Sequence, residues 1–126
     1  MDLFLDTLQT NAVTTACNAI YAGVPVLTLA GNHPLARACT SVMEAAGPLT
    51  LTQRFIAIDK EDYKQKAIEF GLNSQEFATL KKAFHEQVPQ SHLLDIPARV
   101  KVIETAYEKM WALHQQGLAP QTFTID

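Results

Sequence analysis

Cysteine is scarce in this chain of 126 residues, and the two that occur, Cys17 and Cys39, each lie within a helical pattern of apolar residues. Two such cysteines cannot form a disulfide framework and lack the paired spacing of a zinc site. We expect both to be small, buried hydrophobic side chains. The four histidines show no metal-ligand spacing either. We therefore predict no metal and no cofactor.

Charged residues make up only 18% of the chain, and the formal net charge is −3. The ten basic residues are spread without a basic stripe, which argues against a nucleic-acid partner. The uncharged stretch over residues 7–34 contains glycine, asparagine and proline and cannot span a membrane. No signal-peptide pattern opens the chain, so we expect a cytoplasmic protein without a membrane partner. With 48% apolar residues, the chain can bury a core as one domain.

Apolar runs alternate with helical stripes over the first 72 residues. Leu3–Leu5 is a short apolar run ending at Asp6, which is typical of a strand covered on both faces. Residues 13–20 carry a helical apolar stripe, and Pro25–Leu29 reads as a second buried strand. A second helix is expected over residues 35–46, capped by Asn32 or His33 and ended by Gly47.

The same alternation continues through a third unit. Phe55–Ile58 is the expected third strand, followed by a helix with Asp59 as its N-cap that runs to about Phe70 and ends at Gly71. Strand and helix alternating three times predict an α/β fold: about three parallel strands, flanked by helices and joined by right-handed crossovers.

The last third of the chain lacks strand signals. Asn73 and Glu76 resemble a capping box, and Asp95 with Pro97 opens a long C-terminal helix. We expect Tyr107, Met110 and Trp111 to form a packing face on that helix. We therefore divide the chain into a βαβαβα part, residues 1–72, and a C-terminal helical part, residues 73–120.

Two threonines, Thr14 and Thr15, open the first predicted helix just beyond the carboxyl end of the first strand. A helix start in this position directs unpaired backbone N–H groups and a positive dipole end toward solvent, where a phosphate can bind. The plainer alternative is that the threonines only cap the helix. Asp6 at the strand end could also indicate a phospho-accepting receiver domain, but the acidic pair and lysine such domains need are absent.

Taken together, these residues resemble the C-terminal part of the catalytic region of the O-linked N-acetylglucosamine transferase and SPINDLY family, including its bacterial tetratricopeptide-containing members. The similarity is carried by the order and spacing of a set of residues that covers nearly the whole chain. They are Asp6, Thr7, Asn11, Thr14, Thr15, Ala22, Gly23, Pro25, Thr28, Gly31, Arg37, Ser41, Gly47, Tyr107–Trp111, Gly117 and Pro120.

The resemblance implies half of a Rossmann-like nucleotide-sugar-binding domain in a longer glycosyltransferase. Such an enzyme transfers a sugar, most simply N-acetylglucosamine, from a UDP donor to serine or threonine hydroxyls of an acceptor protein. In the family the paired threonines hold the diphosphate and an acid holds the ribose, so these roles fall on Thr14, Thr15 and Asn18. The resemblance implies no metal. We expect the isolated chain to be inactive.

Three departures from the family pattern lie in the site itself. The family's histidine is Val13, its glycine is Ala12 and its aspartate is Asn18, so we expect weaker UDP binding or a different donor. The alternative is a degenerate, non-catalytic module used for protein association. A stand-alone flavodoxin-like anion binder would need its own first strand and phosphate loop, which the chain lacks. We also expect a homo-oligomer, through the edge of the Leu3–Leu5 strand and the Tyr107 face.

Overall fold

The computed structural model describes residues 1–125, which divide into two compact units, residues 1–94 and the segment that begins at Asp95. The first unit contains the whole sheet, and it continues beyond residue 72 because the helix over residues 74–87 packs against the sheet's own helices. None of the helices within residues 1–125 is both long and apolar enough to cross a membrane.

The first unit is built on a three-stranded parallel sheet in the order β1-β2-β3. The strands are β1 (Phe4–Leu5), β2 (Val26–Leu29) and β3 (Ile56–Ala57). Phe4 pairs with Val26, and Thr28 pairs with Ile56. The predicted α/β fold with about three parallel strands is therefore confirmed, as half of a Rossmann-like domain.

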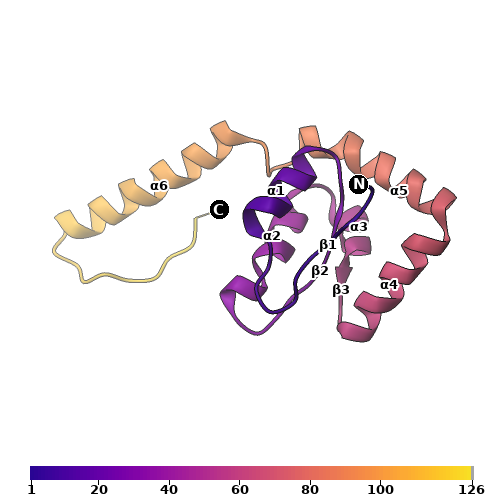
Figure 1. Ribbon diagram of the computed structural model, residues 1–126. Coiled ribbons are helices and arrows are strands. Elements are labelled where there is room, and N and C mark those ends of the chain that lie inside the picture. Colours follow the sequence, from indigo (N-terminus) through magenta and orange to yellow (C-terminus); the bar gives the residue numbers. More distant parts are fainter. Residues whose placement is uncertain (126) are drawn as a thin grey trace. The chain divides into compact units, whose positions relative to one another are not determined.

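Helices flank this sheet on two sides (Figure 1). The helices and short 3₁₀ turns of the unit are α1 (Val13–Tyr21), η1 (Pro34–Ala36), α2 (Ala38–Ala45), α3 (Leu49–Thr52), η2 (Gln53–Phe55), α4 (Lys60–Leu72), α5 (Ser74–Gln87) and η3 (Val88–Gln90). The α1 and α2 helices contact each other and β2, whereas α4 packs on β2 and β3 from the other side and contacts α5.

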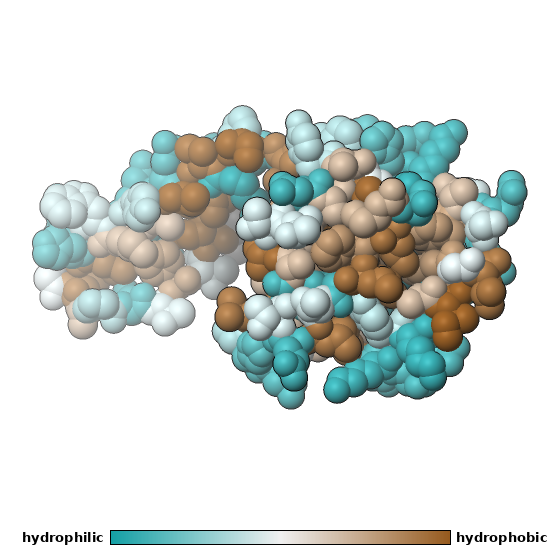
Figure 2. Space-filling view, in the orientation of Figure 1, coloured by the Kyte–Doolittle hydropathy of each residue, from teal (hydrophilic) through white to brown (hydrophobic). Residues whose placement is uncertain are grey.

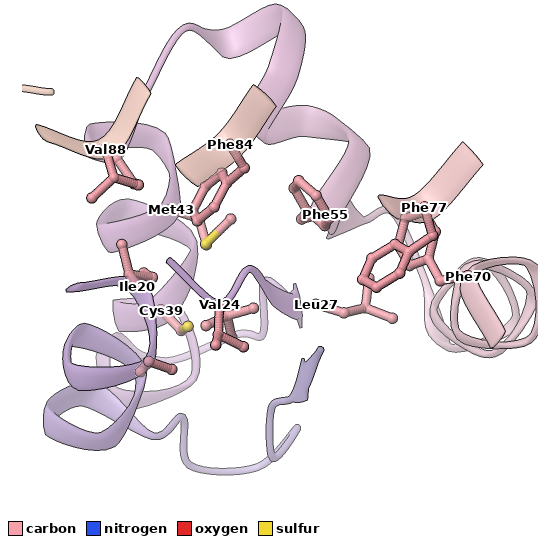
Figure 3. Packing of buried hydrophobic residues seen from close by; sticks show 14 residues of the cluster. Ile20, Val24, Leu27, Cys39, Met43, Phe55, Phe70, Phe77, Phe84 and Val88 are labelled. Atoms are coloured by element: carbon pink, nitrogen blue, oxygen red, sulfur yellow. The ribbon is translucent and has the colours of Figure 1, made fainter. Parts of the chain in front are cut away.

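The core lies between the sheet and these helices, and its aromatic rings come from three elements (Figure 3). The ring centroid of Phe55 is 5.6 Å from that of Phe70 and 5.5 Å from that of Phe84. These separations are typical of favourable aromatic pairs. The central strand β2 is buried on both faces, as its mostly apolar sequence predicts, with Thr28 as the one polar residue.

Strand β1 differs from this expectation because it forms one edge of the sheet. The Phe4 and Asp6 amides donate to Pro25 and Leu27 of the neighbouring segment. Leu5 is 54% exposed, so the prediction that both faces of this run are covered is wrong for Leu5. The third strand is also shorter than predicted, because Phe55 ends a 3₁₀ turn and Ile58 is exposed.

The predicted helix over residues 35–46 is interrupted near its start. Pro34 opens a 3₁₀ turn, Arg37 has a φ of −120°, and α2 begins only at Ala38. The expected caps were wrong, because neither the Asn32 nor the His33 side chain makes a capping hydrogen bond there.

Two further helix ends differ from their predictions, while one cap is confirmed. The Asp59 side chain accepts a hydrogen bond from the Asp62 amide at 2.8 Å, as expected of the N-cap of α4. The helix continues past Gly71 to Leu72. Asn73 makes no side-chain cap, and Glu76 instead pairs with Arg54 at 3.5 Å, so the predicted capping box is absent.

The second unit consists of α6 (Ile96–Gln115) and the tail that follows it. The Asp95 side chain accepts from the Ala98 amide at 3.1 Å, which confirms the predicted start of this helix. Gly117 has a φ of +69°, a conformation that favours glycine and ends the helical segment. The tail returns toward the helix, with Lys109 Nζ 4.6 Å from the ring centroid of Phe123.

Candidate functional site

The carboxyl end of β1 is fixed by the buried side chain of Asp6. Its Oδ1 atom accepts hydrogen bonds from the amides of Thr7 at 2.9 Å and Ala12 at 2.8 Å. Its Oδ2 atom accepts from the Thr28 hydroxyl on β2 at 2.7 Å. One carboxylate therefore ties together the strand end, the neighbouring strand and the residue just before α1. With both oxygens engaged inside the protein, Asp6 is a structural residue and no phospho-acceptor.

Asn11 fixes the same loop from its other side. Its buried Nδ2 atom donates to the Thr7 carbonyl at 3.0 Å, and its Oδ1 atom accepts from the Cys39 amide at 3.2 Å. The backbone amide of Asn11 donates to the Leu35 carbonyl at 2.9 Å. These bonds satisfy an amide in the first turn of α2 that lacks a partner within its helix. They also hold the start of α1 against the start of α2.

The start of α1 presents unpaired backbone donors. The first bond of this helix runs from the Ala16 amide to the Ala12 carbonyl at 3.0 Å, so Val13, Thr14 and Thr15 precede it. Within residues 1–125 no acceptor is found for these three amides, and no side chain caps the helix. The site differs in this respect from the start of α4, where Asp59 provides the cap. An anion can therefore find three donors at α1.

The sequence-predicted site residues lie together here. Thr14 and Thr15 are exposed and lie in the first turn of α1, as predicted, although residues 7–12 separate that turn from the strand end. Asn18 is exposed one turn further along, three and four residues beyond the threonines, so the three side chains share one face of the helix. Two hydroxyls and one amide therefore lie beside the unpaired N–H groups.

The first turn of α1 contains no acidic residue of its own. In the part of the chain that the structure describes, the one carboxylate bonded to this helix start is that of Asp6. It accepts from the Ala12 amide just before the turn and leaves the amides of Val13, Thr14 and Thr15 as the positive end of the helix dipole. Within residues 1–125 no group of three histidine, cysteine or acidic side chains is placed to hold a metal ion. A phosphate bound here would be held by N–H groups and hydroxyls.

Tyr63 and Thr28 stabilise the loop between β1 and α1, and no structural role was predicted for either residue. The Tyr63 hydroxyl donates to the Asp6 carbonyl at 2.9 Å, across a separation of 57 residues. Burial raises the pKa of this phenol, and the Asp6 carboxylate adds to the effect. A threonine in an otherwise apolar strand could have signalled the bond from Thr28, but no local pattern identifies Tyr63.

The two cysteines take no part in this chemistry. Cys39 is fully buried, as expected, and burial raises the pKa of its thiol to about 12, with the Asp6 carboxylate acting in the same direction. A thiol with such a pKa stays protonated and unreactive at neutral pH. Cys17 is only half-buried, so the prediction that both cysteines are buried holds for Cys39 alone.

Two hollows lie near the sheet, and neither includes the threonines. One of about 430 Å³ lies at the carboxyl ends of the strands and is lined by Gln9, Asn32, His33, Asp59 and Lys60 among others. The larger one, of about 830 Å³, follows the open edge of β1 between Leu5, Phe70 and Phe77. The larger hollow is mostly apolar, and the charged side chains in its lining include Asp2 and Lys81, which form an ion pair at 2.7 Å.

The chain is similar to several known proteins. The sequence model of glycosyl transferase family 41 matches residues 1–103 of the chain. The chain is 34% identical over 98% of its length to a probable UDP-N-acetylglucosamine–peptide N-acetylglucosaminyltransferase, SEC of Arabidopsis thaliana. It is 27% identical over 95% of its length to a SPINDLY protein of Solanum lycopersicum that carries the same activity in its name. In both cases the chain spans 12% of the relative's own length.

Proposed function

Because the chain belongs to glycosyl transferase family 41, we propose that the start of α1 holds the diphosphate of a UDP-sugar donor. The observation that carries this proposal is the set of three unpaired amides at Val13, Thr14 and Thr15, with no acid in the turn. Helix starts of this kind bind phosphates through N–H groups and the helix dipole. The hydroxyls of Thr14 and Thr15 add two further donors.

The names of the two relatives indicate the reaction that we propose for the longer protein. A UDP-N-acetylglucosamine–peptide transferase moves N-acetylglucosamine from UDP to a protein, and we assign this chain to such an enzyme, with serine or threonine hydroxyls as acceptors. As the sugar leaves, negative charge grows on the departing diphosphate. Fixed donors at the start of α1 stabilise that charge more than they stabilise the bound substrate, which lowers the barrier.

Asn18 completes the proposed donor contacts. Its exposed amide lies one turn beyond the threonines and can bond a ribose hydroxyl, without the added strength of a carboxylate. Val13 contributes no polar side chain, and it is 41% exposed beside the proposed site. The contacts that this chain offers are therefore few and uncharged, which favours weak binding of UDP by the chain alone.

Calorimetric titration with UDP tests this proposal. We expect the wild-type chain to bind with a dissociation constant of about 1 mM or weaker, about −4 kcal/mol. Val13→His adds a donor next to the diphosphate, and a hydrogen bond to a charged group contributes about 1.5–3 kcal/mol, so UDP should bind about tenfold more tightly or better. Removing both hydroxyls, with Thr14→Ala and Thr15→Ala in the Val13→His chain, should reverse most of that gain.

Thr50→Ala in the same Val13→His chain is the matched control, because Thr50 is an exposed threonine on another helix. It should leave the affinity unchanged. Low-micromolar binding of UDP by the wild-type chain would contradict the expectation that its contacts are few. No gain from Val13→His would favour the alternative, a non-catalytic module used for protein association.

A further inference from the structure

Helix α4 turns one face toward the sheet, and Tyr63 lies at the N-terminal end of that face. Hydrophilic residues gather over the start of the helix (Figure 2), where Glu61 and Lys64 are exposed. The inward residues recur at helical spacing and are half-buried or buried. They are Tyr63, Lys66, Ala67 and Phe70. The phenol of Tyr63 is therefore turned inward at the end of the helix that follows the carboxyl end of β3.

The hydroxyl of Tyr63 joins the two outer strands of the sheet. In the order β1-β2-β3, β1 and β3 are the edges, and no backbone hydrogen bond of the sheet connects them directly. Tyr63 belongs to the helix that follows β3, yet its hydroxyl donates to the carbonyl of Asp6 at the end of β1, 2.9 Å away. This bond therefore fixes one edge of the sheet to the helix that follows the other.

The first turns of α4 are themselves fastened to β3. The carboxylate of Asp62 accepts from the Ile58 amide at 2.9 Å. The ammonium of Lys66 donates to the Ile56 carbonyl at 2.8 Å. Tyr63 lies between these two residues in the sequence, so its hydroxyl is presented from a helix turn that is held at both sides. A side chain on such a support can place its bonding partner accurately.

Asp6 benefits from this support because its strand is short. Strand β1 contains two residues, and the amides of Phe4 and Asp6 donate to the segment of β2 beside it. The carboxylate of Asp6 in turn accepts from the Ala12 amide just before α1. The carbonyl and the side chain leave the same Cα atom, so a rotation of Asp6 displaces the acceptor of the Ala12 amide as well.

We propose that Tyr63 is a positioning residue of the donor site, which acts through Asp6 to hold the start of α1 in place. The inference rests on the proposed function, because it concerns the same three amides, at Val13, Thr14 and Thr15. Tyr63 acts by preorganisation and not by contact with the diphosphate. A helix start that is already fixed loses less conformational freedom when an anion binds to it.

Hydrogen exchange followed by NMR tests the first step without any ligand. Tyr63→Phe removes only the hydroxyl, and the Ala12 amide should exchange about fivefold faster, the factor that one hydrogen bond typically contributes. The Phe84 amide, on a fully buried residue of α5, is the internal reference. It should change much less, because a general loss of stability would accelerate both amides by the same factor. Tyr21→Phe, the same change at an exposed tyrosine, is the matched control and should alter neither amide.

Calorimetric titration with UDP tests the second step. In the Val13→His chain, Tyr63→Phe should weaken binding of UDP about threefold, less than the change in exchange, because binding restores part of the lost order. Tyr21→Phe in the same chain should leave the affinity unchanged. A residue that only stabilised the fold would lower the resistance to urea and leave the dissociation constant of the folded chain as it was.

The outcomes separate this inference from the proposed function. Equal acceleration at Ala12 and Phe84, or none at Ala12, would overturn the positioning role. So would an unchanged UDP affinity in a Tyr63→Phe chain whose Ala12 amide exchanges faster. Absence of UDP binding in every chain would instead overturn the proposed function. The exchange of the Ala12 amide, measured without ligand, would then still decide whether Tyr63 holds the start of α1.

Discussion

Asp6 is the residue on which the geometry of the proposed diphosphate site depends most. Replacing it with alanine removes the acceptor of the Ala12 amide and of the Thr28 hydroxyl, which leaves both donors without a partner. Each unsatisfied buried group costs about 1–3 kcal/mol, so Asp6→Ala should lower the free energy of unfolding by about 3 kcal/mol or more. Urea denaturation measures this loss.

Thr28→Val isolates one of these bonds. The substitution keeps the shape of the side chain but leaves Asp6 Oδ2 without its donor, and it should cost about 1–3 kcal/mol. Thr50→Val makes the same chemical change on an exposed helix and should stay within about 0.5 kcal/mol of the wild type. Equal effects of the two substitutions would show that the buried bond contributes nothing.

The carboxyl group of Asp62 is expected to make the stability of the protein depend on pH. The Ile58 amide and the Lys66 ammonium, each 2.9 Å away, hold the pKa of its carboxyl below the ordinary value of 3.8. Because the pKa is lowered in the folded state, the ionised carboxylate stabilises the protein above that ordinary value. This stabilisation is lost as the pH falls through the lower folded pKa.

Asp62→Asn tests that assignment. The variant should be less stable than the wild type at pH 7, and the difference in unfolding free energy should shrink as the pH falls from about 5 toward 2. Urea denaturation at several pH values checks this trend. A difference that stays constant over the whole range would mean that the charge of Asp62 contributes nothing.

At the scale of elements, the turn between α1 and β2 depends on Gly23. Its φ is +76°, and a Cβ atom there would lie 1.9 Å from His85 Nδ1. Gly23→Ala should therefore cost about 1–2 kcal/mol for the backbone conformation, and more for displacing the imidazole. The same substitution made in a His85→Ala chain should show only the backbone cost. A neutral Gly23→Ala would contradict both causes.

Elements with a strong local pattern were predictable from the sequence. The apolar stripe that begins at Val13 predicted α1, the mostly apolar run around Leu27 predicted β2, and the caps at Asp59 and Asp95 were correct. The start of α2 was not predictable. Its partner is Asn11, 28 residues away from Cys39, and no local spacing reveals such a bond.

The candidate site was predictable only in part, for the same reason. Local spacing placed Thr14 and Thr15 in the first turn of a helix. The interactions that position this turn are long-range, since Asp6 bonds to Thr28 and Tyr63 bonds to Asp6. The exposure of Leu5 also escaped prediction, because an apolar run does not say whether its strand lies at the centre or the edge of a sheet.

At the scale of the whole molecule, the proposed site lies on the first unit beside the strand with an open edge. Ligands of parallel α/β sheets bind beyond the carboxyl ends of the strands, which is where Asp6 and Asn11 hold the start of α1. The chain spans about an eighth of its relatives' length. We therefore propose that the chain contributes one part of the donor site of a longer protein.

The central claim is that the start of α1 binds the diphosphate of UDP, and an NMR titration of the backbone amides measures this most directly. On addition of millimolar UDP, we predict the largest shifts at Val13, Thr14 and Thr15, with smaller ones at Asn18. Uridine, which lacks the diphosphate, should shift the first three amides much less. Shifts concentrated around His33 and Asp59, or along Leu5 and Phe77, with Thr14 and Thr15 unchanged, would contradict the claim.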